Sequence, residues 1–137
     1  MLRLLLLGIK REMIMKIRIG ISGTKEYSDR DRIKKYCYKL KQLFEEDLVI
    51  VTRGKAYGAE KLAKNMANLF DIEYEEILPM HKKWKTIEYS SKVGFLNSKE
   101  YAENLDSLVI FGENLPEALS WVIDNLKKQN KKVVFRQ

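Results

Sequence analysis

Two glycines four residues apart, Gly54 and Gly58, are the feature of this sequence that best predicts chemistry. Arg53 and Lys55 place a basic residue on each side of Gly54. The run 49–51 before them is β-branched, and apolar residues return after them at helical spacing, which predicts a strand, a glycine loop and a helix. The first N–H groups of a helix have no partner within it and favour an anion. We therefore expect a phosphate group to bind at this turn.

The composition also favours an anionic partner. Lys and Arg outnumber Asp and Glu by 26 to 19, which gives a net charge of +7. A nucleotide, a nucleic acid or an acidic surface is the partner class that this charge favours, and a solvated basic surface is the alternative. With His81 as the only histidine and Cys37 as the only cysteine, we expect no metal site, no cofactor and no internal disulfide. A free cysteine also fits a cytoplasmic protein.

The rest of the chain must position these residues, and its periodicity predicts strands alternating with helices. We expect strands at 16–22, 48–52, 72–78, 105–111 and 132–135. The helix after the first strand should have Ser28 or Asp29 as its N-cap, and Pro116 should open the last helix. Residues 89–104 predict an irregular helical segment. The fold class is α/β, a Rossmann-like three-layer α/β/α arrangement with a mainly parallel sheet of about five strands.

The first 15 residues are predicted to stand apart from this domain. Their apolar run 2–9 is about half the length of a membrane span, so we expect no membrane partner. Charged residues follow the run where a signal-peptide cleavage site would need small ones. Because Met13 and Met15 come just before the first strand, we interpret 1–15 as an upstream start, with an added edge segment as the alternative. Residues 16–137 are then a single nucleotide-binding domain.

In an open parallel sheet, ligands bind outside the carboxyl ends of the strands, where the strand order reverses. The loops at that end are 23–29, 53–58, 79–88 and 112–116. We expect the ligand site to be built from these four loops.

Three stretches at these loops match a known set of motifs in the right order. Residues 23–29 read GTKEYSD, residues 54–63 read GKAYGAEKLA, and Trp84 is followed at 93–97 by VGFLN. On these stretches the chain resembles the SLOG superfamily of Rossmann-like nucleotide-binding domains, in particular its stand-alone YspA/YpsA-like branch. The motifs of that branch read G-S-R-D-Y-x-D, G-G-A-x-G-A-D-x-x-A and, after a Trp, A-G-x-x-R-N. The resemblance covers 16–137 and implies a nucleotide ligand.

Two departures from the family pattern bear on catalysis. Leu96 stands where the family has an arginine, and the loop 112–116 is shorter than the family's glycine-threonine loop. In LOG-type phosphoribohydrolases, which are relatives, that loop grips the phosphate and supplies a carboxylate for N-glycosidic cleavage. Glu117, Glu113 and Glu60 are the carboxylates left as candidate acid or base.

The predicted site combines the loop residues with the positions that match the motifs. The residues expected to bind the nucleotide or its phosphate are Gly23, Thr24, Lys25, Arg53, Gly54, Lys55, Ala56, Gly58, Glu60, Gly94, Asn97 and Gly112. Tyr27 and Trp84 are candidates for base stacking. For Glu60, a bond to a ribose hydroxyl and a role in complementing the helix dipole both stay open. Gly54 and Gly58 have a structural alternative as ordinary connection glycines.

These observations predict a protein that binds or senses a nucleotide or nucleotide derivative and forms a homo-oligomer. One alternative is a LOG-type enzyme that cleaves an N-glycosidic or phosphate bond of a nucleotide. The other is single-stranded nucleic-acid binding, as in the related DprA branch, with Trp84 and its neighbouring lysines as the contact surface.

Overall fold

Strands and helices alternate along the chain, as a computed structural model that describes residues 16–79 and 91–136 shows. In chain order the elements are β1 (Ile17–Gly23), α2 (Arg30–Phe44), the short 3-10 helix η2 (Glu45–Asp47), β2 (Leu48–Thr52), α3 (Gly58–Leu69), β3 (Glu73–Glu76), α5 (Ser91–Glu103), β4 (Ser107–Phe111), α6 (Glu117–Lys128) and β5 (Lys132–Arg136). This order confirms the predicted α/β class. The predicted loop residues His81 and Trp84, and the extension 1–15, lie outside the described residues.

The described strands form one sheet in the order β3-β2-β1-β4-β5, and every neighbouring pair is parallel. The predicted mainly parallel sheet of about five strands is therefore confirmed. In register, Ile19 lies beside Ile50 on one side and Ile21 lies beside Val109 on the other. The strand order reverses between β1 and β4, so the crevice that parallel sheets use for ligands lies at the carboxyl ends of these two strands.

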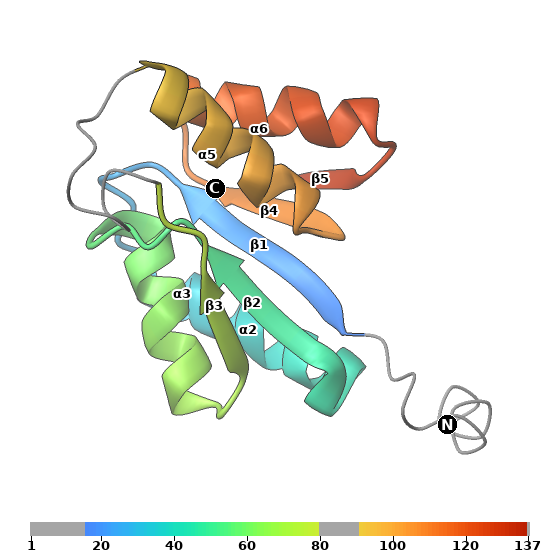
Figure 1. The fold of residues 1–137 in the computed structure, drawn as a ribbon. Helices are drawn as coiled ribbons and strands as arrows, with labels where there is room; N and C mark the ends of the chain where they lie inside the picture. The colour runs from blue at the N-terminus through green and yellow to red at the C-terminus, as the bar shows by residue number, and fades with distance from the viewer. Residues whose placement is uncertain (1–15, 80–90, 137) are drawn as a thin grey trace, which may run out of the picture.

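The helices form a layer on each face of this sheet (Figure 1). α2 and α3 pack together on one face, and α5 and α6 pack together on the other. Side chains of β2 alternate between the two layers, with Leu48 and Ile50 in the core beneath α2 and α3, and Val49 and Val51 in the core beneath α5 and α6. A strand buried on both faces reads as a continuous apolar run, which is why β2 was predictable.

Element ends agree with the prediction where a local signal sets them. The Asp29 carboxylate accepts a hydrogen bond from the Arg32 N–H at 3.1 Å, so the predicted N-cap of α2 is present. Residues 89–104 were expected to form an irregular helical segment, and Ser91–Glu103 is an α-helix, which confirms the helical part of that prediction. β4 begins two residues later than expected, because the Leu105 N–H binds the Ala102 carbonyl at 3.2 Å in the turn that ends α5.

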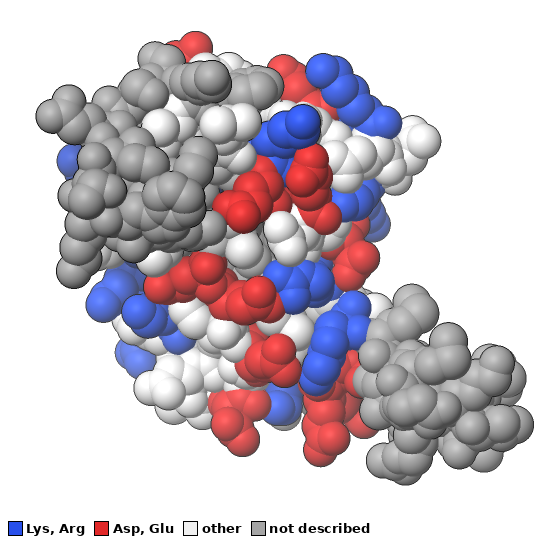
Figure 2. Space-filling model, in the orientation of Figure 1, with Lys and Arg blue, Asp and Glu red and all other residues white. Residues whose placement is uncertain are grey.

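On the sheet face that α5 and α6 cover, these helices do not extend over β3 or the beginning of β1 (Figure 1), and this open face carries charged side chains. Figure 2 shows acidic and basic side chains interspersed over this part of the molecule. Two ion pairs connect this edge of the sheet. Arg18 of β1 pairs with Glu75 of β3, and Lys16, which comes just before β1, pairs with Glu73 of β3. In the described part of the chain, no helix is both long and apolar enough to cross a membrane.

Candidate functional site

A cavity of about 320 Å³ lies at the carboxyl edge of the sheet, where the loop after β1 meets the beginnings of α3 and α6. Its lining residues are Gly23, Thr24, Lys25, Glu26, Arg53, Lys55, Tyr57, Glu60, Asn114, Pro116 and Ala118. We call this cavity the switch-point pocket, because these loops follow β1, β2 and β4 around the reversal of strand order. The position is the one that general rules for parallel sheets assign to a ligand.

A buried ion pair between Arg53 and Glu60 contributes to the wall of this pocket. The Glu60 Oε2 accepts hydrogen bonds from Arg53 Nε at 3.0 Å and from Nη2 at 2.8 Å, while Oε1 accepts the Arg53 backbone N–H at 2.7 Å. The two side chains are only 4% and 2% exposed. Both carboxylate oxygens of Glu60 are thus bonded to Arg53, and the loop that leaves β2 is tied to the first turn of α3.

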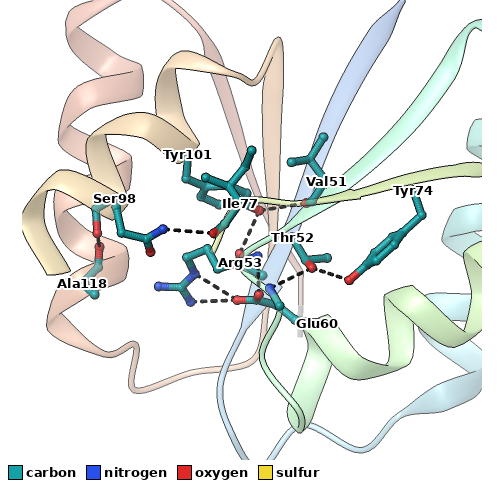
Figure 3. A network of polar contacts seen from close by, with 12 residues as sticks. Val51, Thr52, Arg53, Glu60, Tyr74, Ile77, Ser98, Tyr101 and Ala118 are labelled. Atoms are coloured by element: carbon teal, nitrogen blue, oxygen red, sulfur yellow. Dashed lines mark hydrogen bonds and ion pairs between the residues drawn. The ribbon is translucent and has the colours of Figure 1, made fainter. Parts of the chain in front are cut away.

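The same geometry fixes how the Arg53 guanidinium faces the pocket. Glu60 takes the two nitrogens on one edge of the fork, and Figure 3 shows the third nitrogen directed away from Glu60. The guanidinium carbon also lies 6.0 Å from the centre of the Tyr101 ring, a cation–π contact beneath it. A guanidinium donor held in this way can bind an oxyanion without first losing side-chain freedom.

Buried hydroxyl groups hold the strand ends under the pocket (Figure 3). The Tyr101 hydroxyl donates to the Val51 carbonyl at 3.0 Å, so the Ser22 hydroxyl, also 3.0 Å away, donates to Tyr101. Burial raises the pKa of Tyr101, so its proton stays in place. These bonds join α5 to the carboxyl ends of β1 and β2.

A second hydroxyl chain supports the glycine loop. Thr52 accepts the Gly54 N–H at 3.1 Å and lies 2.6 Å from the Tyr74 hydroxyl, which donates to Glu76 at 2.8 Å. Since Tyr74 gives its one proton to Glu76, Thr52 donates to Tyr74. The chain therefore fixes the turn at Gly54 from β2 and β3 together.

Two glycines at this edge allow close packing around Thr24. Gly58 has φ +66, and a Cβ there would lie 2.4 Å from the Thr24 carbonyl oxygen. Gly112 has φ +99, and its Cβ would lie 2.5 Å from Thr24 Oγ1. The Thr24 N–H also bonds to the Phe111 carbonyl at 3.1 Å. The loops after β1, β2 and β4 thus meet at Thr24. The close approach of Gly58 to the Thr24 carbonyl supports the structural alternative for this glycine.

Two helix N-termini meet the switch-point pocket. α3 begins at Gly58 after an extended Tyr57, and α6 begins at Glu117 after Pro116, and neither N-cap side chain caps its helix. The first N–H groups of each helix therefore receive no hydrogen bond from the side chain of its N-cap residue. The helix dipole makes both helix ends favourable for an anion. Lys25 and Lys55 add positive charge, with the Lys25 Nζ 5.4 Å from the centre of the Tyr57 ring.

Half of the predicted binding residues come together in this pocket. Those that line it are Gly23, Thr24, Lys25, Arg53, Lys55 and Glu60. Gly54, Ala56, Gly58 and Gly112 lie in the adjoining turns but not among the lining residues.

The other predicted residues have different surroundings. Gly94 lies within α5, and the Asn97 amide donates to the Ile77 carbonyl at 3.0 Å. Tyr27 packs against Phe111, with ring centres 5.4 Å apart, beside the core beneath α2. Glu113 and Glu117 are exposed and do not line the pocket.

Glu26, which also lines the pocket, belongs to the loop 23–29 that was expected at this edge. The four lining residues that were not predicted from the sequence are Tyr57, Asn114, Pro116 and Ala118. Pro116 and Asn114 belong to the loop 112–116, which was expected at this edge, but nothing in the sequence indicated which of its side chains faces a ligand. Asn114 has φ +56, a conformation that asparagine adopts more readily than most residues. Tyr57 had no distinguishing signal, since an aromatic residue beside two glycines fits many turns.

Three solved structures share this fold, although no family model and no curated protein matches the chain in sequence. The molybdenum cofactor binding protein from the phototrophic bacterium Rippkaea orientalis is 21% identical, with a TM-score of 0.65 over 90% of this chain and 78% of that one. The molybdenum cofactor carrier protein from Chlamydomonas reinhardtii is 17% identical, with a TM-score of 0.57 over 89% and 78%. DNA processing protein A from Streptococcus pneumoniae is 14% identical, with a TM-score of 0.52 over 87% and 58%.

These identities are low, and the similarity shows a shared fold. That fold is the α/β architecture that the resemblance implied, and membership of the SLOG superfamily stays a prediction. The YspA/YpsA-like branch and the relation to LOG-type enzymes stay predictions.

Proposed function

We propose that this protein binds a phosphate-bearing small molecule, a nucleotide or nucleotide derivative, in the switch-point pocket. The observation that carries the proposal is the Arg53 side chain, which is buried, held by Glu60 and among the lining residues of the cavity. A phosphate at this wall would accept hydrogen bonds from the third guanidinium nitrogen of Arg53 and from the backbone N–H groups at the start of α3. Lys25 and Lys55 would offset the remaining negative charge.

The fold adds one specific ligand to be tested. Two of the similar structures are, by their names, a binding protein and a carrier for the molybdenum cofactor. We therefore include this cofactor beside nucleotides as a ligand of the pocket. A carrier or sensor role suits a site in which none of the three predicted acid or base candidates is available, because Glu60 is bonded to Arg53 and Glu113 and Glu117 lie outside the lining.

Cleavage of a nucleotide has less support in the geometry. Both oxygens of Glu60 accept from Arg53, and Glu113 and Glu117 do not line the pocket. A general acid or base needs a proton that it can exchange with the substrate. The homo-oligomer and the cytoplasmic location also stay proposals.

Isothermal titration calorimetry with mononucleotides, dinucleotides, ADP-ribose, cyclic derivatives and the molybdenum cofactor tests the proposal. We expect one ligand class to bind, and Lys25→Gln to weaken its binding about tenfold through the loss of one charged contact. Lys61→Gln is the matched control, because Lys61 is exposed on α3 and does not line the pocket. Absence of binding across the panel, or equal losses in the two variants, would contradict the proposal.

A further inference from the structure

A second and larger cavity, of about 570 Å³, lies on the α2 side of the sheet. α2 supplies Arg32, Lys35, Tyr36 and Lys39, and the ends of β4 and β5 supply Phe111 and Arg136. We call this cavity the α2 groove. It shares no lining residue with the switch-point pocket.

Cations are concentrated in the α2 groove. Arg32, Lys35 and Lys39 follow one another at helical spacings of three and four, so they share one side of α2 over roughly 10 Å. Arg136 faces them from the end of β5. Within residues 16–79 and 91–136, none of these four side chains forms an ion pair. Neighbouring charges of one sign repel, and a bound anion would relieve that repulsion.

The two acidic residues at the groove do not cancel this charge. The carboxylate of Asp29 is engaged as the N-cap of α2, where it accepts the Arg32 N–H. Asp31 lies in the first turn of α2, where a negative charge complements the helix dipole. Four cations against two carboxylates leave the groove with an excess of positive charge.

The aromatic rings of the groove are not open to a nucleobase. Phe111 is fully buried, and its ring contacts Tyr27 and Tyr36. Tyr36 is half-buried, and the Arg136 guanidinium carbon lies 5.9 Å from its ring centre. Proteins that bind single-stranded nucleic acid combine cations with exposed rings on which bases stack. The groove offers the cations alone.

We propose that the α2 groove binds an oligophosphate, a chain of linked phosphate groups recognised by its charge and without a base. The cations extend along α2 instead of converging on one point, which suits a chain of phosphates better than a single phosphate. The source is either an inorganic oligophosphate or the phosphate tail of a nucleoside triphosphate. This site and the switch-point pocket are independent, because their lining residues differ.

Calorimetric titration of the full chain with sodium tripolyphosphate tests this proposal. We expect binding that weakens about tenfold or more in Lys35→Gln/Lys39→Gln, since two charged contacts are lost. The control, Lys34→Gln/Lys127→Gln, removes the same charge from exposed positions that do not line the groove, and it should bind within about twofold of the parent. Circular dichroism of both double variants checks that they fold.

Titrations with ATP and with oligothymidylate distinguish an inorganic oligophosphate from a nucleotide triphosphate tail and from nucleic acid. ATP that binds as tightly as tripolyphosphate, with the same loss in the groove variant, assigns the site to a triphosphate tail; weaker ATP binding assigns it to the inorganic chain. Oligothymidylate that binds more tightly than both would assign the groove to nucleic acid and overturn the proposal. No tripolyphosphate binding, an equal loss in the control, or loss only in Lys25→Gln would overturn it as well.

Discussion

Arg53 and Glu60 show how a single pair can prepare a binding site. Glu60 restricts the Arg53 guanidinium to one orientation, in which its third nitrogen points away from Glu60 (Figure 3). A lysine at this position would present a point charge and could not make the same forked contact. The sequence predicted both residues as ligand contacts, but it did not predict their pairing. Residues seven apart across a turn are brought together only by the backbone path at Gly54, which local spacing does not reveal.

Replacement of Glu60 tests the pair directly. We expect Glu60→Gln to lower the free energy of unfolding by about 3 kcal/mol, because it leaves the buried guanidinium without its counter-charge. Urea denaturation at pH 7 measures this loss. Glu103→Gln, at an exposed position on α5, should change it by no more than about 0.5 kcal/mol. Similar values for the two variants would show that Arg53 does not depend on Glu60.

At the scale of elements, the strand, glycine loop and helix from β2 to α3 position the pocket. Their order was predictable because a buried parallel strand and an amphipathic helix each leave a clear pattern in the sequence. Loops follow no such pattern. Tyr57 and Asn114 face the pocket because three loops pack around Thr24, and those contacts arise only in the folded chain. Gly94 and Asn97 were predicted from a motif alone, and α5 places Asn97 on the carbonyl of Ile77 instead.

The start of α3 gives a prediction at this scale. We expect Gly58→Ala to lower the free energy of unfolding by about 2 kcal/mol, because alanine disfavours the positive φ and its Cβ meets the Thr24 carbonyl. Thermal and urea denaturation measure the change. Ala56→Ser, at an exposed position of the same loop, is the control and should have little effect. A stable Gly58→Ala protein that only loses ligand would instead assign this glycine to the ligand.

Across the whole molecule, the net charge of +7 is unevenly distributed. Both signs are mixed on the open face of β1 to β3 (Figure 2), whereas four cations gather in the α2 groove. The sequence predicted an anionic partner from the total charge. It could not show that the charge divides between two sites, because that division follows from which helix covers which half of the sheet.

The open face makes stability depend on pH. The Arg18 guanidinium donates a hydrogen bond to Glu75 and so holds the pKa of that carboxyl below its usual value. A folded-state pKa below the unfolded one adds stability above about pH 4.3, and this stability is lost as the pH falls through the folded pKa. We expect Glu75→Gln to cost about 0.5 kcal/mol at pH 7 for such an exposed pair. Urea denaturation from pH 7 to pH 3 should show the difference from the parent disappear; a constant difference would contradict this account.

The central claim is that the switch-point pocket holds a phosphate-bearing ligand, and amide chemical shifts locate such a ligand most directly. A ¹⁵N-labelled sample would be titrated with the tightest-binding ligand of the calorimetric panel and followed by two-dimensional NMR. The account predicts the largest shifts at the amides of Lys25, Lys55, Gly58, Ala59 and Glu60, together with the Arg53 side-chain Nε–H. Shifts confined to α2 and β5, or spread evenly over exposed lysines, would contradict it.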